Sequence, residues 1–149
     1  MMARVSCLKI SMRGIVDISL MDKTHPKKIL IIDDDPFIAD MYVIKFKAEG
    51  FEVESAQDGI DGMERAAKLK PDVILLDVVM PNMDGFDVLQ KLRQDPSLGH
   101  PIIIFLTNFG QREDVKRGMQ LGADGYIIKA HFTPSEVSAK VTEMLPNKH

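Results

Sequence analysis

Five short apolar segments recur along the chain after Pro26, and a stretch with helical periodicity separates each from the next. The segments are 28–32, 51–55, 72–76, 101–106 and 125–128. Four of them are nearly continuous apolar runs, as expected of parallel strands covered on both faces, whereas 51–55 alternates and suits an edge strand. The pattern predicts an α/β fold, a doubly wound five-stranded parallel sheet of the (βα)5 type.

The stretches between these segments carry signals of helix starts and helix faces. Asp35-Pro36 suits an N-cap followed by proline at the first helical position, which makes Asp35 a better cap than metal ligand, and Asp84 with Asp87 resembles a capping pair. Apolar residues at helical spacing predict the stripes that cover the sheet. These residues are Phe37, Met41, Ile44 and Ala48, then Ile60, Met63 and Ala67, then Phe86, Leu89 and Leu92.

The length and composition of the chain suit one domain. The chain has 149 residues, 45% of them hydrophobic, and domains commonly contain about 100–150 residues around a single core. We expect this domain over residues 27–146, followed by a short tail at 147–149. Residues 1–26 show no sustained strand or helix period, which predicts a weakly ordered N-terminal extension.

Charge and cysteine content exclude several classes of protein. A formal net charge of −3 argues against direct binding of nucleic acid. Cys7 is the single cysteine and cannot form an internal disulfide bond, and no apolar stretch approaches the roughly 20 residues that span a bilayer. We therefore expect a cytoplasmic protein that has no membrane partner.

Polar side chains follow four of the five predicted strands. Asp33 and Asp34 come after 28–32, Asp77 after 72–76, Thr107 after 101–106 and Lys129 after 125–128. The carboxyl ends of parallel strands meet at one edge of a doubly wound sheet, where such folds bind their ligands. The sequence therefore predicts a site that contains three acids, a hydroxyl and an amine.

Three carboxylates at this edge need a compensating cation. Carboxylates a few ångströms apart repel one another and raise one another's pKa values unless a positive charge offsets them. Mg²⁺ suits such a site because it binds one or two carboxylates, keeps several waters and leaves positions for phosphate oxygens. A carboxylate beside a bound metal can attack phosphorus, and an aspartyl phosphate is a known type of covalent intermediate. Asp77, with Thr107 and Lys129 beside it, is thus a candidate phosphoryl acceptor.

Residues 27–146 resemble a two-component response-regulator receiver domain of the stand-alone, single-domain type. The resemblance rests on Asp33-Asp34 after Ile29–Ile32, Asp77 before Met80-Pro81 and Met83-Asp84-Gly85, Thr107 in Phe105–Asn108, and Lys129 at the end of Gly122–Lys129. It implies a flavodoxin-like sheet with strand order 2-1-3-4-5. It also implies the function of a phosphoacceptor in a two-component phosphorelay.

The resemblance assigns a role to each site residue. Asp77 is expected to accept the phosphoryl group from a histidine kinase or phosphotransfer protein. Lys129 then pairs with the phosphoryl oxygens, Thr107 moves to contact them, and Tyr126 is the switch aromatic residue that turns inward. Mg²⁺ is expected on Asp33, Asp34, Asp77 and the backbone carbonyl of Val79, with Asp33 acting mainly through water.

The resemblance also implies how the protein signals. Such a domain is not an enzyme beyond phosphorylating and dephosphorylating itself. It signals by contact with a downstream target protein, through a surface that corresponds to about residues 111–144.

Four residues depart from the usual receiver pattern. Ala130 follows Lys129 where receivers usually have a cis-proline, so the loop that aims Lys129 loses that support. Asn108 replaces a small residue after Thr107 and could narrow access to Asp77. Val79 and Phe109 are apolar at positions that tune hydrolysis, which predicts a long-lived phosphorylated state.

Two other functions remain open from the sequence. Asp33-x-Asp35 after an apolar strand resembles the nucleophile motif of haloacid-dehalogenase-like phosphatases, although Phe37 stands where those enzymes have threonine or valine and no later acidic pair completes their metal site. The second alternative is a receiver-like binding module that works without phosphorylation, a possibility that Asn108 and Ala130 raise.

Overall fold

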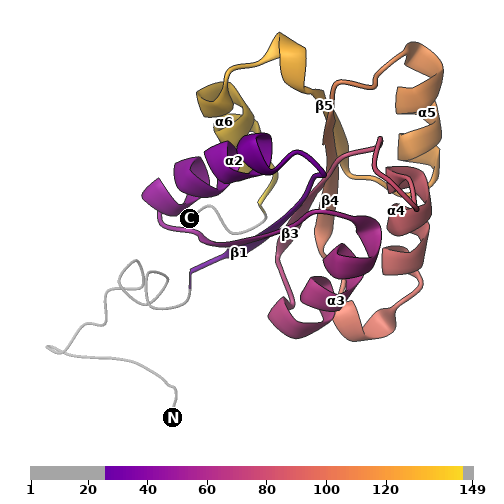
Figure 1. Ribbon diagram of the computed structural model, residues 1–149, viewed down its shortest axis with the longest axis horizontal. Helices are drawn as coiled ribbons and strands as arrows, with labels where there is room; N and C mark the ends of the chain where they lie inside the picture. Colours follow the sequence, from indigo (N-terminus) through magenta and orange to yellow (C-terminus); the bar gives the residue numbers. More distant parts are fainter. Residues whose placement is uncertain (1–25, 146–149) are drawn as a thin grey trace, which may run out of the picture.

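The computed structural model describes residues 26–145, which form a parallel sheet of five strands with helices on both faces (Figure 1). The strands are β1 (Lys28–Ile32), β2 (Glu52–Ala56), β3 (Val73–Leu76), β4 (Ile102–Thr107) and β5 (Gly125–Ile128). The helices are α2 (Pro36–Ala48), α3 (Gly59–Leu69), α4 (Gly85–Arg93), α5 (Arg112–Gln120) and α6 (Pro134–Met144), with 3₁₀ turns η1 (Pro96–Leu98) and η2 (Lys129–His131).

The strands lie in the order β2-β1-β3-β4-β5, which confirms the doubly wound fold. Each predicted segment contains or overlaps its strand, with shifts of one residue at β2, β3 and β4. Apart from Pro26, the N-terminal extension predicted at 1–26 lies outside the described residues, as does the tail at 147–149. No helix within residues 26–145 is long and apolar enough to cross a membrane.

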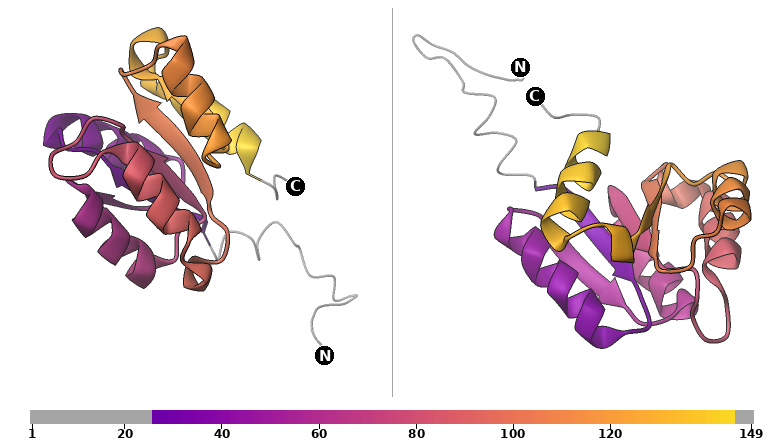
Figure 2. Two further views of the ribbon diagram at one scale, coloured as in Figure 1. Left: turned by 90° about the vertical axis from the view of Figure 1, so that its right-hand side faces the viewer. Right: turned by 90° about the horizontal axis from the view of Figure 1, so that it is seen from above.

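Two apolar layers hold the helices to the sheet. Helices α2 and α6 cover one face, and α3, α4 and α5 cover the other (Figure 2). Successive residues of β1 point to opposite layers: Ile31 packs in the cluster that contains Phe46 and Val137, whereas Ile32 packs with Phe86 and the rest of the second cluster. Because both faces are covered, all four residues of β3 are buried, as the apolar runs predicted.

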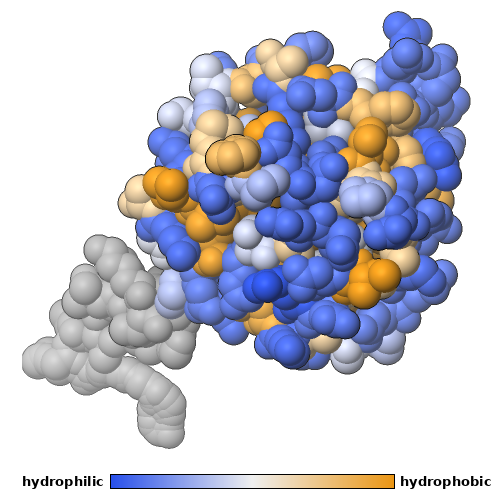
Figure 3. Space-filling model, viewed as in Figure 1, coloured by the Kyte–Doolittle hydropathy of each residue, from blue (hydrophilic) through white to orange (hydrophobic). Residues whose placement is uncertain are grey.

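The apolar stripe predicted for the first helix is wrong. Phe37 and Ile44 are 85% and 70% exposed, and Met41 is also exposed, whereas the buried residues of α2 are Ala39, Tyr42 and Phe46. The helix carries two apolar stripes, and periodicity alone does not tell which one faces the sheet. The exposed stripe contributes to the apolar surface over α2 in Figure 3.

The stripe predicted for the second helix is also largely wrong. Ile60 is half exposed and Ala67 is exposed, and α3 instead buries Gly59, Gly62, Ala66 and Leu69. A Cβ atom on Gly62 would lie 2.5 Å from the Cδ1 atom of Ile32, so the missing side chain brings this helix close to β1. In the third helix, Phe86, Leu89 and Leu92 are buried as predicted.

The two phenylalanines of α2 provide a direct test of its orientation. We predict that Phe46→Ala lowers the free energy of unfolding by about 3–5 kcal/mol, because this fully buried ring packs edge-on against Phe51. Phe37→Ala is the matched control and should change it by less than about 0.5 kcal/mol, because its ring lies in solvent. Urea denaturation of both variants measures the difference. A large loss in Phe37→Ala would contradict this orientation.

Candidate functional site

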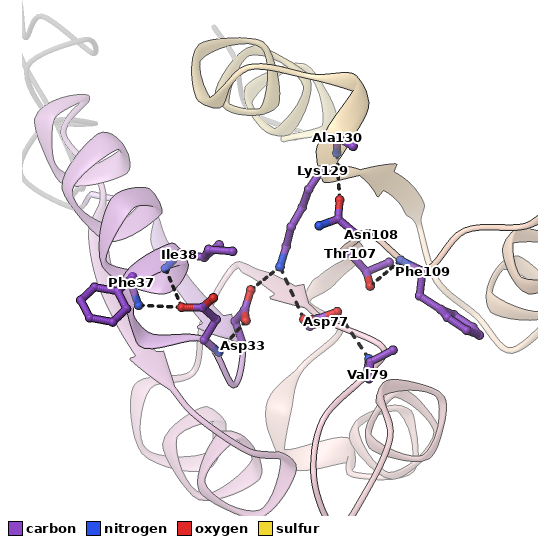
Figure 4. Close-up of polar contacts among 11 residues, drawn as sticks. Asp33, Phe37, Ile38, Asp77, Val79, Thr107, Asn108, Phe109, Lys129 and Ala130 are labelled. Carbon is purple, nitrogen blue, oxygen red and sulfur yellow. Dashed lines mark hydrogen bonds and ion pairs between the residues drawn. The ribbon is translucent and has the colours of Figure 1, made fainter.

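The carboxyl ends of the strands line a pocket of about 400 Å³. It brings together the site residues that the sequence predicted from four strand ends, and Figure 4 shows several of them converging from opposite sides. Its lining residues are Asp33, Asp34, Asp35, Ile38, Asp77, Val79, Thr107, Asn108, Phe109 and Lys129. Tyr126 is not among them.

Three acids cluster in the lining of this pocket. One carboxylate oxygen from each of Asp33, Asp34 and Asp77 lies within 4.8 Å of the other two. Asp33 and Asp77 are buried, whereas Asp34 is exposed to solvent. An all-oxygen set with one open side fits a hard cation that keeps part of its water shell, and Mg²⁺ is such a cation. The donor set therefore fits the metal that the sequence predicted.

Lys129 supplies the positive charge of the site. Its Nζ atom lies 2.6 Å from Asp33 Oδ2 and 3.5 Å from Asp77 Oδ2 (Figure 4). Burial alone would lower the pKa of this amine, but the hydrogen bond to Asp33 and the charge of Asp77 outweigh it, so the pKa of Lys129 is raised. The ammonium form therefore lies between the two buried carboxylates.

The surroundings of Asp33 have opposing effects on the pKa of its carboxyl group. Burial raises the pKa of Asp33, while the hydrogen bond from Lys129 and another from the Asp35 backbone N–H, at 2.9 Å, lower it. The pKa remains raised overall. The Asp35 side chain itself accepts hydrogen bonds from the N–H groups of Phe37 and Ile38, as expected of the N-cap of α2.

Asp77 is held by the backbone around it. Its N–H donates to the Ile32 carbonyl at 2.9 Å, which extends the pairing of β1 and β3, and its Oδ1 atom accepts from the Val79 N–H at 3.4 Å. Gly85, at the start of α4, lies so close behind that a Cβ atom there would clash with the Asp77 carbonyl oxygen. The motif around Asp84-Gly85 contains this glycine, but the sequence alone does not show what it contacts.

Thr107 and Tyr126 hold the same loop residue from two sides. The Phe109 N–H donates to Thr107 Oγ1 at 3.1 Å, and the Tyr126 hydroxyl donates to the Phe109 carbonyl. Burial, together with the negative charges of Asp114 and Asp77, raises the pKa of Tyr126 to about 12, so its hydroxyl stays protonated and able to donate. The site and the tyrosine outside it are thus connected through one residue of the loop.

The two departures next to Thr107 and Lys129 contact each other. The Ala130 N–H donates to Asn108 Oδ1 at 3.0 Å. In the sequence these residues are two separate departures from the receiver pattern, because nothing there signals a contact between residues 22 positions apart. Lys129 nevertheless reaches both buried acids, so the loop aims it at the site without proline.

Comparison with known proteins assigns the chain and its fold to a family. A family profile described as the response regulator receiver domain matches residues 29–142. The DNA-binding dual master transcriptional regulator RpaA of Synechocystis sp. is 42% identical over 118 residues, which cover 79% of this chain and 48% of RpaA. The chain spans about half the length of the curated relatives it matches.

Solved structures agree with this assignment. The chemotaxis protein CheY4 of Vibrio cholerae has a TM-score of 0.76 and 32% identity, over 80% of this chain and 99% of CheY4. The BeF3-activated receiver domain of Klebsiella pneumoniae RstA has a TM-score of 0.75 and 26% identity, over 81% of this chain and 100% of that domain. The chain belongs to the response regulator receiver domain family of two-component systems.

Proposed function

We propose that Asp77 accepts a phosphoryl group from a histidine kinase or phosphotransfer protein and that the phosphorylated domain signals by protein contact. The observation that carries this proposal is the position of the Asp77 carboxylate, which lines an open pocket beside two further acids and 3.5 Å from Lys129 Nζ. Receiver domains are in general signalling modules rather than enzymes, and self-phosphorylation and self-dephosphorylation are the chemistry we assign to this one.

The transfer is a displacement at phosphorus. An oxygen of Asp77 attacks the phosphorus of a phosphohistidine, and the new P–O bond forms as the P–N bond breaks and its electron pair leaves on the imidazole nitrogen. Asp33, Asp34, Asp77 and the Val79 carbonyl would hold Mg²⁺, which would offset the negative charge that develops as the phosphoryl group approaches the acids. The Lys129 ammonium group then donates to a phosphoryl oxygen in place of Asp77.

Thr107 and Tyr126 carry the change away from the site. A phosphoryl group adds about −1.5 to −2 charge and strong acceptor oxygens, which attract the Thr107 hydroxyl. Thr107 then gives up its hydrogen bond with the Phe109 N–H, and Tyr126, the switch residue, turns inward and releases the Phe109 carbonyl. The loss of hydrogen bonds to Phe109 thus changes the conformation of the loop that leads into α5.

Two surfaces suit two kinds of partner. The exposed apolar stripe of α2, formed by Phe37, Met41 and Ile44, begins beside pocket residues Asp35 and Ile38, so a phosphodonor protein that packs on it can place its histidine at the pocket. The surface of about residues 111–144 follows the Thr107 loop and includes Tyr126. We assign this second surface to the downstream target, and the cytoplasmic location expected from the sequence stays a prediction.

The phosphatase alternative finds little support in the geometry. The side chain of Asp35, the second acid of the Asp33-x-Asp35 pattern, accepts hydrogen bonds from the first N–H groups of α2. It is engaged as a helix cap, which does not suit the second catalytic acid of a phosphatase. Asp33 is bound to Lys129 at 2.6 Å, which holds the proposed nucleophile of such an enzyme in an ion pair. A receiver-like binding module that works without phosphorylation predicts a different result in the phosphorylation experiment that follows.

Phosphorylation of single-site variants tests the proposal. After incubation with Mg²⁺ and acetyl phosphate, the wild-type protein should gain the mass of one phosphoryl group, whereas Asp77→Asn should gain none because a neutral amide replaces the nucleophilic carboxylate. Asp33→Asn is the matched control and should still be modified, though more slowly, because it keeps Asp77. Intact-mass spectrometry over time measures both rates.

Each alternative predicts a different outcome of this experiment. Turnover of a phosphomonoester that disappears in Asp33→Asn would support the phosphatase. A wild-type protein that gains no phosphoryl group would support the binding module.

Mg²⁺ binding can be tested separately by thermal unfolding. A ligand that binds only the folded state adds about 2.7 kcal/mol at 100 times its Kd, so we predict that Mg²⁺ raises the Tm of the wild-type protein. Asp34→Asn should lose most of this increment because its carboxylate belongs to the acid cluster. Asp35→Asn makes the same charge change one residue away, keeps a good N-cap and should retain the increment. Equal losses in both variants would indicate only a nonspecific effect of charge.

A further inference from the structure

Asn108 bridges two strand ends at the mouth of the pocket. The last paired residues of β4 and β5 are Thr107 and Ile128, and the hydrogen bond between Asn108 Oδ1 and the Ala130 N–H lies just beyond that pair. Figure 4 shows Asn108 beside the Lys129 side chain, pointing up to Ala130. The side chain thus continues the connection between the two strands where their backbone ladder ends.

This bond depends on the residue types at both ends. A backbone N–H can only donate, so the amide atom that faces it is the oxygen of Asn108, and the amino group points elsewhere. Proline has no N–H, so a receiver with proline at position 130 cannot form the bond. A small residue at position 108 would have no acceptor that reaches Ala130. Asn108 and Ala130 therefore form a matched pair.

The residue between the two anchor points is Lys129. Before it, Ile128 is held by the ladder to β4, and after it, Ala130 is held by Asn108. The turn itself contributes one longer hydrogen bond, from the Phe132 N–H to the Lys129 carbonyl at 3.3 Å. The backbone of Lys129 is thus fixed on both sides, and its side chain, only 10% exposed, extends to Asp33 and Asp77.

We propose that Asn108 is a positioning residue that aims Lys129 at the phosphoryl site by holding the Ala130 N–H. A proline after the lysine stiffens the chain at that point. In this protein the hydrogen bond between Asn108 and the Ala130 N–H takes that role. The consequence for phosphorylation rests on the proposed function of Asp77, whereas the consequence for the loop backbone does not.

Amide hydrogen exchange tests the loop backbone directly. In Asn108→Ala, the protection of the Ala130 amide should fall about fivefold, which corresponds to about 1 kcal/mol at 1.4 kcal/mol per tenfold change. The Gly85 amide, which donates to the Val78 carbonyl on another side of the site, should keep its protection. Unchanged exchange of Ala130 would overturn the proposal, whether or not the protein is phosphorylated.

A double-mutant cycle tests whether Asn108 acts through Lys129. Asn108→Ala should slow phosphorylation by acetyl phosphate about fivefold in the wild-type background and have no further effect in Lys129→Met. An equal slowing in both backgrounds would overturn the proposal, because Asn108 would then act on the donor or on Asp77 directly. No phosphorylation of the wild-type protein would refute the proposed function but leave the exchange result decisive for the loop.

Substitutions of Ala130 provide the matched control. Ala130→Ser keeps the N–H and should leave the phosphorylation rate unchanged. Ala130→Pro removes the donor, so Asn108→Ala should have no effect on the rate in the Ala130→Pro background. A further loss there would contradict the pairing of the two residues.

Discussion

The ammonium group of Lys129, placed between two buried carboxylates, is the interaction on which this site depends. Asp33 and Asp77 end neighbouring strands, and both lose most of their hydration at the edge of the sheet. Two unpartnered buried charges would destabilise that edge or become protonated. Lys129 compensates both from the far side, after β5, so the charge balance of the site joins β1, β3 and β5 in one cluster. A phosphoryl group or metal ion that enters the pocket therefore changes the ion pairs that Lys129 forms with Asp33 and Asp77.

The loops around the pocket connect this charge balance to the rest of the domain. Thr107 and Tyr126 both bind the backbone of Phe109, and Asn108 next to them binds the backbone beside Lys129. The loop after β4 is therefore bonded to Thr107, to Tyr126 and to the backbone next to Lys129. Asn108 and Ala130 are two departures from the receiver pattern, and they form a hydrogen bond with each other. Slow hydrolysis, expected because Val79 and Phe109 are apolar, stays a prediction.

The parts of this structure that follow from local chemistry could be predicted from the sequence, and the parts that follow from packing could not. Continuous apolar runs such as Val73–Leu76 identify buried parallel strands, and strand ends then place Asp33, Asp77, Thr107 and Lys129 at one edge. Helix α2 shows the limit. It has two apolar stripes, and only contact with the sheet selects Phe46 over Phe37 for the core.

The hydrogen bonds that shape the site are beyond sequence patterns for a related reason. They join side chains and backbone groups that are distant in the chain, as in the bond between Asn108 and Ala130. Gly85 is similar, since its small size matters only because α4 begins against the Asp77 backbone. Such contacts become visible only when the loops are placed in three dimensions.

A crystal structure of the protein grown with Mg²⁺ and beryllofluoride tests the central claim most directly. We predict a beryllofluoride group on a carboxylate oxygen of Asp77. One Mg²⁺ should lie among Asp33, Asp34 and Asp77, and Lys129 Nζ should lie within hydrogen-bond distance of a fluorine atom. An adduct on Asp33 or Asp34, or a bound Mg²⁺ with Asp77 unmodified, would contradict it.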